Sequence, residues 1–227
     1  MKTAVTGSTA PEIAYGIRRL GGEPITLESG ETDLIDVMER TGPLGLVHIG
    51  ADEPKAMLSL AEQCRELDLE FSADPTGLEG GEAVEFIGGA KFLVTSTEGY
   101  QFLQATTGLD DDGILSEVRV RVTDEDAEGV EIAGHDMDGS RVPVARAREP
   151  IDPAGVHEAF TAGLLACLGW GMSLRRAAEV GGQLGVIASE SVGTRYYSVN
   201  PVEFVQRLEE SYGAAAAAEA SAYVVPD

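Results

Sequence analysis

Two kinds of apolar pattern alternate along most of the chain. Short continuous apolar runs, such as Gly45-Leu-Val-His-Ile49 and Lys91-Phe-Leu-Val-Thr95, are typical of strands that a parallel sheet buries on both faces. Between these runs, longer stretches carry apolar residues at helical spacing. This alternation of strand and helix indicates an α/β fold.

The patterns also give approximate bounds for each element. Strands are predicted near residues 2–6, 24–27, 45–49, 69–73, 91–95, 117–123, 129–133 and 141–145. Helices are predicted near residues 11–20, 31–40, 54–66, 98–107, 155–169, 173–188 and 201–212. Together they suit one domain over residues 1–212. Residues 213–227 form an alanine-rich C-terminal tail, for which a short helical extension and a loose segment both stay open.

The stretch after Ile151 has the features of a loop that leads into a helix N-terminus. Pro153 turns the end of an extended segment, Gly155 permits a tight backbone, and the apolar residues from Phe160 onward recur at helical spacing. A helix start preceded by a glycine presents free N–H groups and a positive dipole end, which suit a phosphate. A carboxylate at this position can accept a proton from a substrate hydroxyl.

This stretch resembles the anion-hole and catalytic-base motif of the ribokinase-like carbohydrate and nucleoside kinases, the PfkB family. The family segment usually reads D-T/P-T-G-A/V-G-D-A-F, and the residues that match it are Asp152, Pro153, Gly155, Val156, Ala159 and Phe160. The second glycine of the motif is replaced by His157, and the catalytic aspartate is replaced by Glu158.

The resemblance covers most of residues 42–212 and is closest to bacterial adenosine-kinase-like members. Val47–Ala51 and Phe71–Pro75 resemble two central strands of the family, and residues 162–194 keep the order and spacing of its last helices. The resemblance implies a ribokinase-like three-layer sandwich with a central, mostly parallel sheet.

The chain is shorter than most family members, which usually run well beyond its 227 residues. Its first strand is followed almost at once by the helix predicted near residues 11–20. In the family, a substrate-binding aspartate and a Gly-Gly pair come before that helix. A second gap falls between Asp36 and Gly42, where the family carries the strands of its lid. We therefore expect the lid strands to be missing, and with them the closure that excludes water from the reaction.

Two further family elements are altered. The N-x-x-E element that orders Mg²⁺ has Ser96 and Gly99 at its two defining positions. Glu98 sits one residue early and would need a local backbone shift to substitute, so we expect no metal site. The T-x-G-x-x-G element near the ATP phosphates corresponds to Thr123–Gly129, in which Asp126 replaces the first glycine. A carboxylate beside a polyphosphate is repulsive by about 1 to 4 kcal/mol at about 4 Å.

The resemblance implies a set of candidate site residues. The degenerate base position is Glu158, and the candidate nucleotide- or anion-binding residues are Gly155, Val156, His157, Thr123, Gly129 and Gly193. The glycines of residues 181–185 lie where the family packs the nucleotide base. Packing between helices is the other explanation for them.

Charge and cysteine content exclude several classes of protein. The 39 acidic residues against 16 basic ones give a formal charge of -23, which argues against binding to nucleic acid or to an anionic membrane. Cys64 and Cys167 are far apart and have no C-x-x-C spacing, so neither a disulfide framework nor a zinc site is indicated. The sequence has neither an 18-residue apolar window nor a signal-peptide pattern, so we expect a cytoplasmic protein.

Two functional hypotheses remain. The favoured one is a degenerate, catalytically inactive or impaired kinase homologue that acts as a binding or regulatory module, with a protein partner such as an active family member. Loss of the lid exposes a sheet edge, which is a template for a partner. On this hypothesis no cofactor is certain. The alternative is a minimal nucleoside or sugar kinase, of the adenosine or ribose type, that uses Glu158 as base together with ATP and Mg²⁺.

Overall fold

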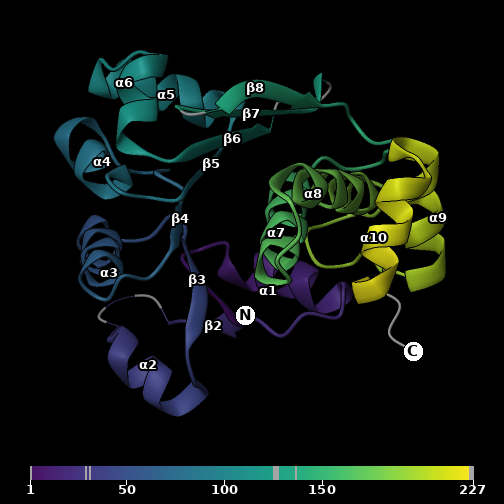
Figure 1. The fold of residues 1–227 in the computed structure, drawn as a ribbon, viewed down its shortest axis with the longest axis horizontal. Helices are drawn as coiled ribbons and strands as arrows, with labels where there is room; N and C mark the ends of the chain where they lie inside the picture. Colours follow the sequence, from purple (N-terminus) through teal and green to yellow (C-terminus); the bar gives the residue numbers. More distant parts are fainter. Residues whose placement is uncertain (1, 29, 31, 125–127, 136, 225–227) are drawn as a thin grey trace. The chain divides into compact units, whose positions relative to one another are not determined.

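The computed structural model describes residues 2–28, 30, 32–124, 128–135 and 137–224. The strands are β1 (Lys2–Thr6), β2 (Ile25–Thr26), β3 (Leu44–Ile49), β4 (Phe71–Ala73), β5 (Phe92–Ser96), β6 (Val120–Asp124), β7 (Val130–Gly134) and β8 (Met137–Val142). The helices are α1 (Ala10–Arg19), α2 (Leu34–Thr41), α3 (Pro54–Glu66), α4 (Gly80–Ile87), α5 (Thr97–Thr107), α6 (Asp111–Glu117), α7 (Val156–Gly169), α8 (Leu174–Ser189), α9 (Pro201–Tyr212) and α10 (Ala214–Val224) (Figure 1).

The chain divides into two compact units. The first consists of Met1–Ala10, Ile25–Asp126 and Glu131–Arg141, and the second of Pro11–Pro24, Ala127–Val130 and Val142–Asp227. The first unit holds nearly all of the sheet together with helices α2 to α6. The second unit holds most of α1 and the helices α7 to α10.

All strands that the described residues form belong to one eight-stranded sheet, in the order β2-β1-β3-β4-β5-β6-β7-β8. The pairs from β2 to β6 are parallel. The links before β7 and β8 span five and two residues, which is too short for a parallel crossover, so these strands run antiparallel. The prediction of an α/β fold with a mostly parallel sheet is confirmed. No strand formed by the described part of the chain lies outside this sheet.

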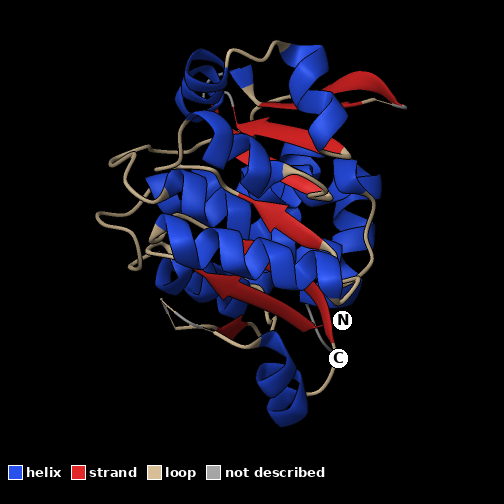
Figure 2. Cartoon of the chain, turned by 90° about the vertical axis from the view of Figure 1, so that its left-hand side faces the viewer, coloured by secondary structure: helices blue, strands red, loops and turns tan. Residues whose placement is uncertain are grey.

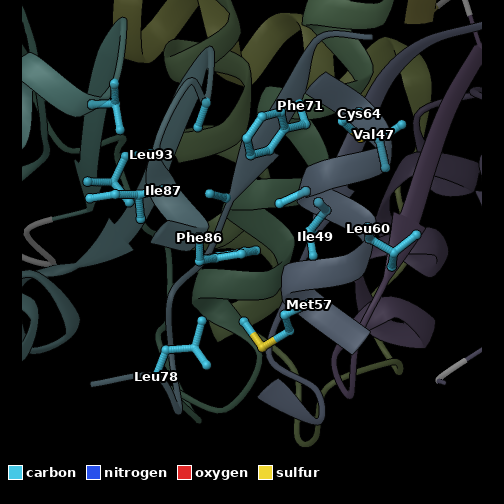
Figure 3. Packing of buried hydrophobic residues seen from close by; sticks show 14 of the residues in the cluster. Val47, Ile49, Met57, Leu60, Cys64, Phe71, Leu78, Phe86, Ile87 and Leu93 are labelled. Atoms are coloured by element: carbon cyan, nitrogen blue, oxygen red, sulfur yellow. The ribbon is translucent and has the colours of Figure 1, made fainter. Parts of the chain in front are cut away.

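The core of the first unit lies between the sheet and helices α2 to α6. Val47, Ile49, Phe71 and Leu93 point from the strands toward Met57, Leu60, Phe86 and other apolar side chains of the helices (Figure 3). Helices α2 to α6 lie in front of these strands when the chain is viewed from their side (Figure 2). Because the parallel strands are short and apolar, the helices fix their positions through this core.

The second unit is built on the pairing of α7 with α8. Helix α7 is apolar on nearly all sides, and its buried residues include Phe160, Leu164 and Leu165. At its centre two glycines face each other, since a β-carbon on Gly163 would lie 2.7 Å from Cα of Gly181. A side chain at either position would force the two helices apart.

The C-terminal alanine-rich segment is a helix rather than a loose segment over residues 214–224. Helix α10 buries Ala216, Ala217 and Ala220. Tyr223 stacks on Trp170 with 5.3 Å between ring centroids, and Glu219 pairs with Arg176 at 2.9 Å. Of the two forms left open for the tail, the structure therefore has the helical extension over residues 214–224.

Several boundaries differ from the prediction. The last strand, β8, ends at Val142, whereas the pattern placed it near residues 141–145. Helices α4 and α6 were not predicted, because each has only one or two turns and begins with glycines or aspartates. None of the helices formed by the described residues is long and apolar enough to span a bilayer.

Candidate functional site

The loop before α7 is held by the carboxylate of Asp152. Oδ1 accepts a hydrogen bond from the Ala154 amide and Oδ2 accepts one from the Gly193 amide, both at 2.9 Å. The amides of Ile151 and Asp152 both donate to the carbonyl of Ser189, at 2.7 and 3.0 Å. The loop is thus tied to the end of α8 and to the segment that follows it.

These hydrogen bonds also set the charge of Asp152. The amide of Ala154, followed by that of Gly193, lowers the pKa of the Asp152 carboxyl below its ordinary value, because both donors stabilise the carboxylate. Asp152 is therefore ionised at neutral pH, and it acts as an anchor for the loop.

Gly155 is required by both backbone conformation and space. It caps α7 in the left-handed region, with φ 79°. A β-carbon there would lie 2.9 Å from Cα of Thr194. Glycine is the residue that tolerates both conditions. The sequence prediction of a tight loop into a helix N-terminus is confirmed, since α7 begins at Val156.

Two of the predicted anion-binding residues have structural contacts. Val156 packs toward α8, where a β-carbon on Gly185 would lie 3.5 Å from Cγ1 of Val156. The amide of Gly193 is used by Asp152. Neither contact prevents the first turn of α7 from presenting backbone donors to an anion.

His157 and Glu158 follow Val156 in this first turn, and both are partly exposed. The imidazole of His157 lies against Phe160, with ring centroids 6.3 Å apart and a 33° tilt. Glu158 places a carboxylate at the positive end of the helix dipole, which favours that carboxylate and competes with an incoming anion. The structure thus brings together Asp152, Gly155, His157 and Glu158.

The remaining predicted positions are distributed between the two units. Thr123 lies in β6 of the first unit, where it is buried beside Thr95 of β5. Neither hydroxyl has a hydrogen-bond partner among the described residues. Gly129 belongs to the second unit, and its β-carbon would lie 2.2 Å from the carbonyl oxygen of Val142, so its glycine serves backbone packing. Asp126, predicted to oppose ATP, lies outside the described residues.

At the position of the family's metal-ordering motif, the structure has an ordinary helix cap. The hydroxyl of Ser96 accepts a hydrogen bond from the Gly99 amide at 3.1 Å and caps α5. The described residues contain no group of three or more His, Cys, Asp or Glu side chains that could hold a metal ion. Ser96 and Gly99 themselves offer no carboxylate ligand.

The glycines of α8 contribute to helix packing. A β-carbon on Gly181 would lie 2.6 Å from the carbonyl oxygen of Phe160 in α7. Gly181 is buried in this contact, so packing between helices explains it without a nucleotide base.

The two cysteines are free and buried. Burial raises the pKa of the Cys64 thiol to about 12 and also raises that of Cys167. Both thiols are therefore protonated and unreactive at neutral pH.

Sequence reasoning named Asp152 and Gly193 but missed the contacts by which they position the loop. Asp152 was assigned as part of a motif, but its bond to Gly193 spans 41 residues and has no local signature. A local signal did exist for its other bond, because Asp-Pro-Ala favours a turn in which the aspartate accepts from the amide two residues on. Thr194 and Ser189 carry no comparable signal.

Solved structures of other proteins share the fold of this chain. No protein-family model matches the chain. A Burkholderia thailandensis nucleoside kinase, solved with inosine, superposes with a TM-score of 0.80 at 18% identity, over 93% of this chain and 98% of that one.

Two further solved structures have the same architecture. The Methanocaldococcus jannaschii nucleoside kinase, an archaeal member of the ribokinase family, superposes with a TM-score of 0.78 at 18% identity, over 90% of this chain and 86% of that one. A Thermotoga maritima ribokinase gives 0.73 at 11% identity, over 92% and 99%. The chain therefore has the α/β fold of the ribokinase-like nucleoside and sugar kinases.

Proposed function

We propose that this chain is a ribokinase-like protein with impaired phosphotransfer, which acts as a binding or regulatory module. The observation that carries the proposal is the first turn of α7, where His157 and Glu158 follow Gly155. In the kinase motif these two positions are glycine and aspartate. A glycine allows a phosphate to approach the backbone closely, whereas an imidazole occupies that space.

The loop that presents this turn supports binding without catalysis. The hydrogen bonds of Asp152 and the left-handed conformation of Gly155 hold the first amides of α7 in place, so the N-terminus of this helix remains suited to an anion. Ser96 and Gly99 provide no carboxylate to order Mg²⁺, which phosphotransfer uses to neutralise developing charge. The proposed ligand is a phosphate-bearing small molecule that is bound but not converted, and that is bound more weakly than at a glycine because His157 limits the approach to the backbone.

The proposed partner is a protein, with an active kinase of the same fold as the candidate. Strand β2 has two residues and lies at one edge of the sheet, and β8 lies at the other. An edge strand carries unpaired backbone groups that a strand of another chain can pair with. The surplus of acidic residues favours a partner with a basic surface.

One observation supports the second candidate function, which is an active kinase. Glu158 retains a carboxylate in the first turn of α7, one methylene longer than aspartate, and the loop before it is intact. This arrangement supports a minimal ATP- and Mg²⁺-dependent nucleoside or sugar kinase in which Glu158 takes the proton from the acceptor hydroxyl. The solved neighbours named as nucleoside kinases and ribokinase support the same acceptor classes.

Calorimetric titration with ADP and ATP, with and without Mg²⁺, tests the binding half of the proposal. We expect saturable binding that Mg²⁺ does not strengthen, and tighter binding in His157→Gly, which clears the helix end. A matched control is His135→Gly, which removes an exposed histidine of the first unit. Absence of binding in both the native chain and His157→Gly would show that the N-terminus of α7 is not an anion site.

A further inference from the structure

Arg207 of α9 forms a buried ion pair with Glu190, which caps the C-terminal end of α8. The side chain of Arg207 is 5% exposed and that of Glu190 is 17% exposed. Nη1 of Arg207 donates to Oε2 of Glu190 at 2.7 Å, and Nη2 donates to Oε1 at 2.6 Å. This bidentate arrangement fixes the orientation of both groups as well as the distance between them. The pair therefore joins α8 to α9 within the second unit (Figure 1).

The same ion pair holds the segment that leads to the loop before α7. Oε1 of Glu190 also accepts a hydrogen bond from the Arg148 amide at 2.7 Å. Nη2 of Arg207 donates to the carbonyl oxygen of Arg146 at 3.4 Å. The backbone is thus attached to the ion pair at Arg148, four residues before Asp152.

Glu190 also lies within the segment that holds Asp152. The residue before it, Ser189, accepts hydrogen bonds at its carbonyl oxygen from the amides of Ile151 and Asp152. Three residues after Glu190, the Gly193 amide donates to the Asp152 carboxylate at 2.9 Å. A shift of Glu190 would therefore displace this acceptor and this donor together.

The ion pair is charged at neutral pH. Burial raises the pKa of the Glu190 carboxyl, but the hydrogen bonds from Arg207 and from the Arg148 amide outweigh burial, so this pKa lies below its ordinary value. Removing one partner of a buried pair is strongly destabilising, because the other charge is then left buried and unpaired. The position of Glu190 thus depends on Arg207.

We propose that Arg207 is a positioning residue for the N-terminus of α7, because it fixes Glu190 and with it the segment that holds Asp152. The proposal deepens the proposed function and rests on its assignment of this helix end as an anion site. Arg207 acts through the hydrogen bonds of the loop before α7. A loop that is ordered before the ligand arrives loses less conformational freedom on binding, so this ordering favours affinity.

A second buried pair on α8 provides the matched control. Arg176 is 17% exposed and pairs with Glu179, which is 6% exposed, and also with Glu219 of α10. Arg176 lies in the first turn of α8, at the opposite end of the helix from Glu190. Both pairs stabilise the packing of α8, but of the two only the Arg207 pair contacts the segment before α7.

Amide hydrogen exchange of the ligand-free protein, followed by NMR, tests the positioning role. In Arg207→Met we expect the Gly193 amide to exchange about tenfold faster, because the loop opens locally once the pair is lost. The amide of Leu164, in the buried middle of α7, serves as the reference for global unfolding. Arg176→Met should leave the exchange of Gly193 unchanged. Unchanged exchange in Arg207→Met, or an equal rise in Arg176→Met, would overturn the proposal.

Glu190→Gln covers the case in which Arg207→Met does not fold. The amide keeps the size of the carboxylate and removes its charge, so the bidentate pair is weakened with little change in shape. We expect the same faster exchange of the Gly193 amide in this variant. Exchange at the native rate would count against the proposal.

Calorimetric titration with ADP links the loop to binding. Arg207→Met should weaken ADP binding about fivefold, whereas Arg176→Met should not weaken it. Because both changes act through one loop, adding Arg207→Met to Asp152→Ala should weaken binding no further than Asp152→Ala alone, and additive effects would overturn the proposal. If the native chain does not bind ADP, the assignment of the anion site is wrong and the proposal falls with it. If ADP binds and the exchange of Gly193 is unaffected, only the role of Arg207 is wrong.

Discussion

Replacing Gly163 with alanine tests whether the glycines of α7 and α8 serve packing or a ligand. The added β-carbon would lie 2.7 Å from Cα, 3.0 Å from N of Gly181, and 3.2 Å from the carbonyl oxygen of Val180. All three atoms belong to the backbone of the neighbouring helix, so no side chain can turn away to make room. The helices must separate or the backbone must shift.

The expected magnitude combines two opposing effects. Overpacking of a buried contact costs about 1 to 3 kcal/mol, and three backbone contacts place Gly163→Ala at the upper end. Alanine recovers about 1 kcal/mol, because it restricts the unfolded chain more than glycine does. The net loss is about 2 kcal/mol in the free energy of unfolding, or about 4 to 8 °C in melting temperature for a protein of this size.

Differential scanning calorimetry measures this loss, and Gly81→Ala provides the matched control. Gly81 lies in α4, and a β-carbon there would meet no atom within 4 Å. The control should be neutral or slightly stabilising. If Gly163→Ala melts at or above the native temperature, the packing argument is wrong. If Gly181→Ala keeps its melting temperature but loses nucleotide binding, the glycines line a ligand site instead.

Three further predictions concern charge. Glu131→Gln removes the ion-pair partner of Arg121, whose guanidinium is buried over the ring of Tyr100. Because Glu131 is one-third exposed, the change should lower the free energy of unfolding in urea by about 1 to 2 kcal/mol. Adding Arg121→Met to the same variant should recover part of this loss, and no recovery would contradict the buried-charge argument. Asp152→Ala should lower the melting temperature above about pH 4, where the carboxylate is charged in the folded and unfolded chain. Because the folded pKa of Asp152 is lowered, this stability is lost as the pH falls through that pKa, and a difference that persists at lower pH would contradict it. The net charge of -23 should make the melting temperature rise between about 0.05 and 1 M NaCl through screening, and a flat or falling curve would show that repulsion is not limiting.

The sequence patterns predicted the sheet well where strands are apolar on both faces. β3 and β5 match their predicted ranges closely, because runs such as Phe92-Leu-Val have no competing interpretation. The edge strand β8 was misplaced, since Met137–Val142 contains Asp138, Gly139 and Ser140 and has no apolar alternation. Helix α6 was missed because the cap Asp110 and two further aspartates resemble a polar turn.

Only part of the candidate site could be predicted from the sequence. The loop and the start of α7 were predicted from local signals, which are a proline, a glycine and an apolar pattern at helical spacing. The contacts that define the site are long-range. The Asp152–Gly193 bond spans 41 residues, and Gly155 lies against Thr194 across a similar separation, so neither contact has a spacing that a sequence pattern can reveal.

Single-turnover phosphotransfer tests the central claim most directly. The protein is held in excess over γ-labelled ATP in the presence of Mg²⁺. Adenosine, inosine and ribose are supplied as acceptors. The labelled product is compared between the native chain, Glu158→Gln and the control Glu149→Gln, which changes an exposed glutamate. We predict no labelled acceptor above the level of Glu158→Gln. Phosphorylation of any acceptor that the control retains and Glu158→Gln abolishes would contradict the account and establish Glu158 as a catalytic base.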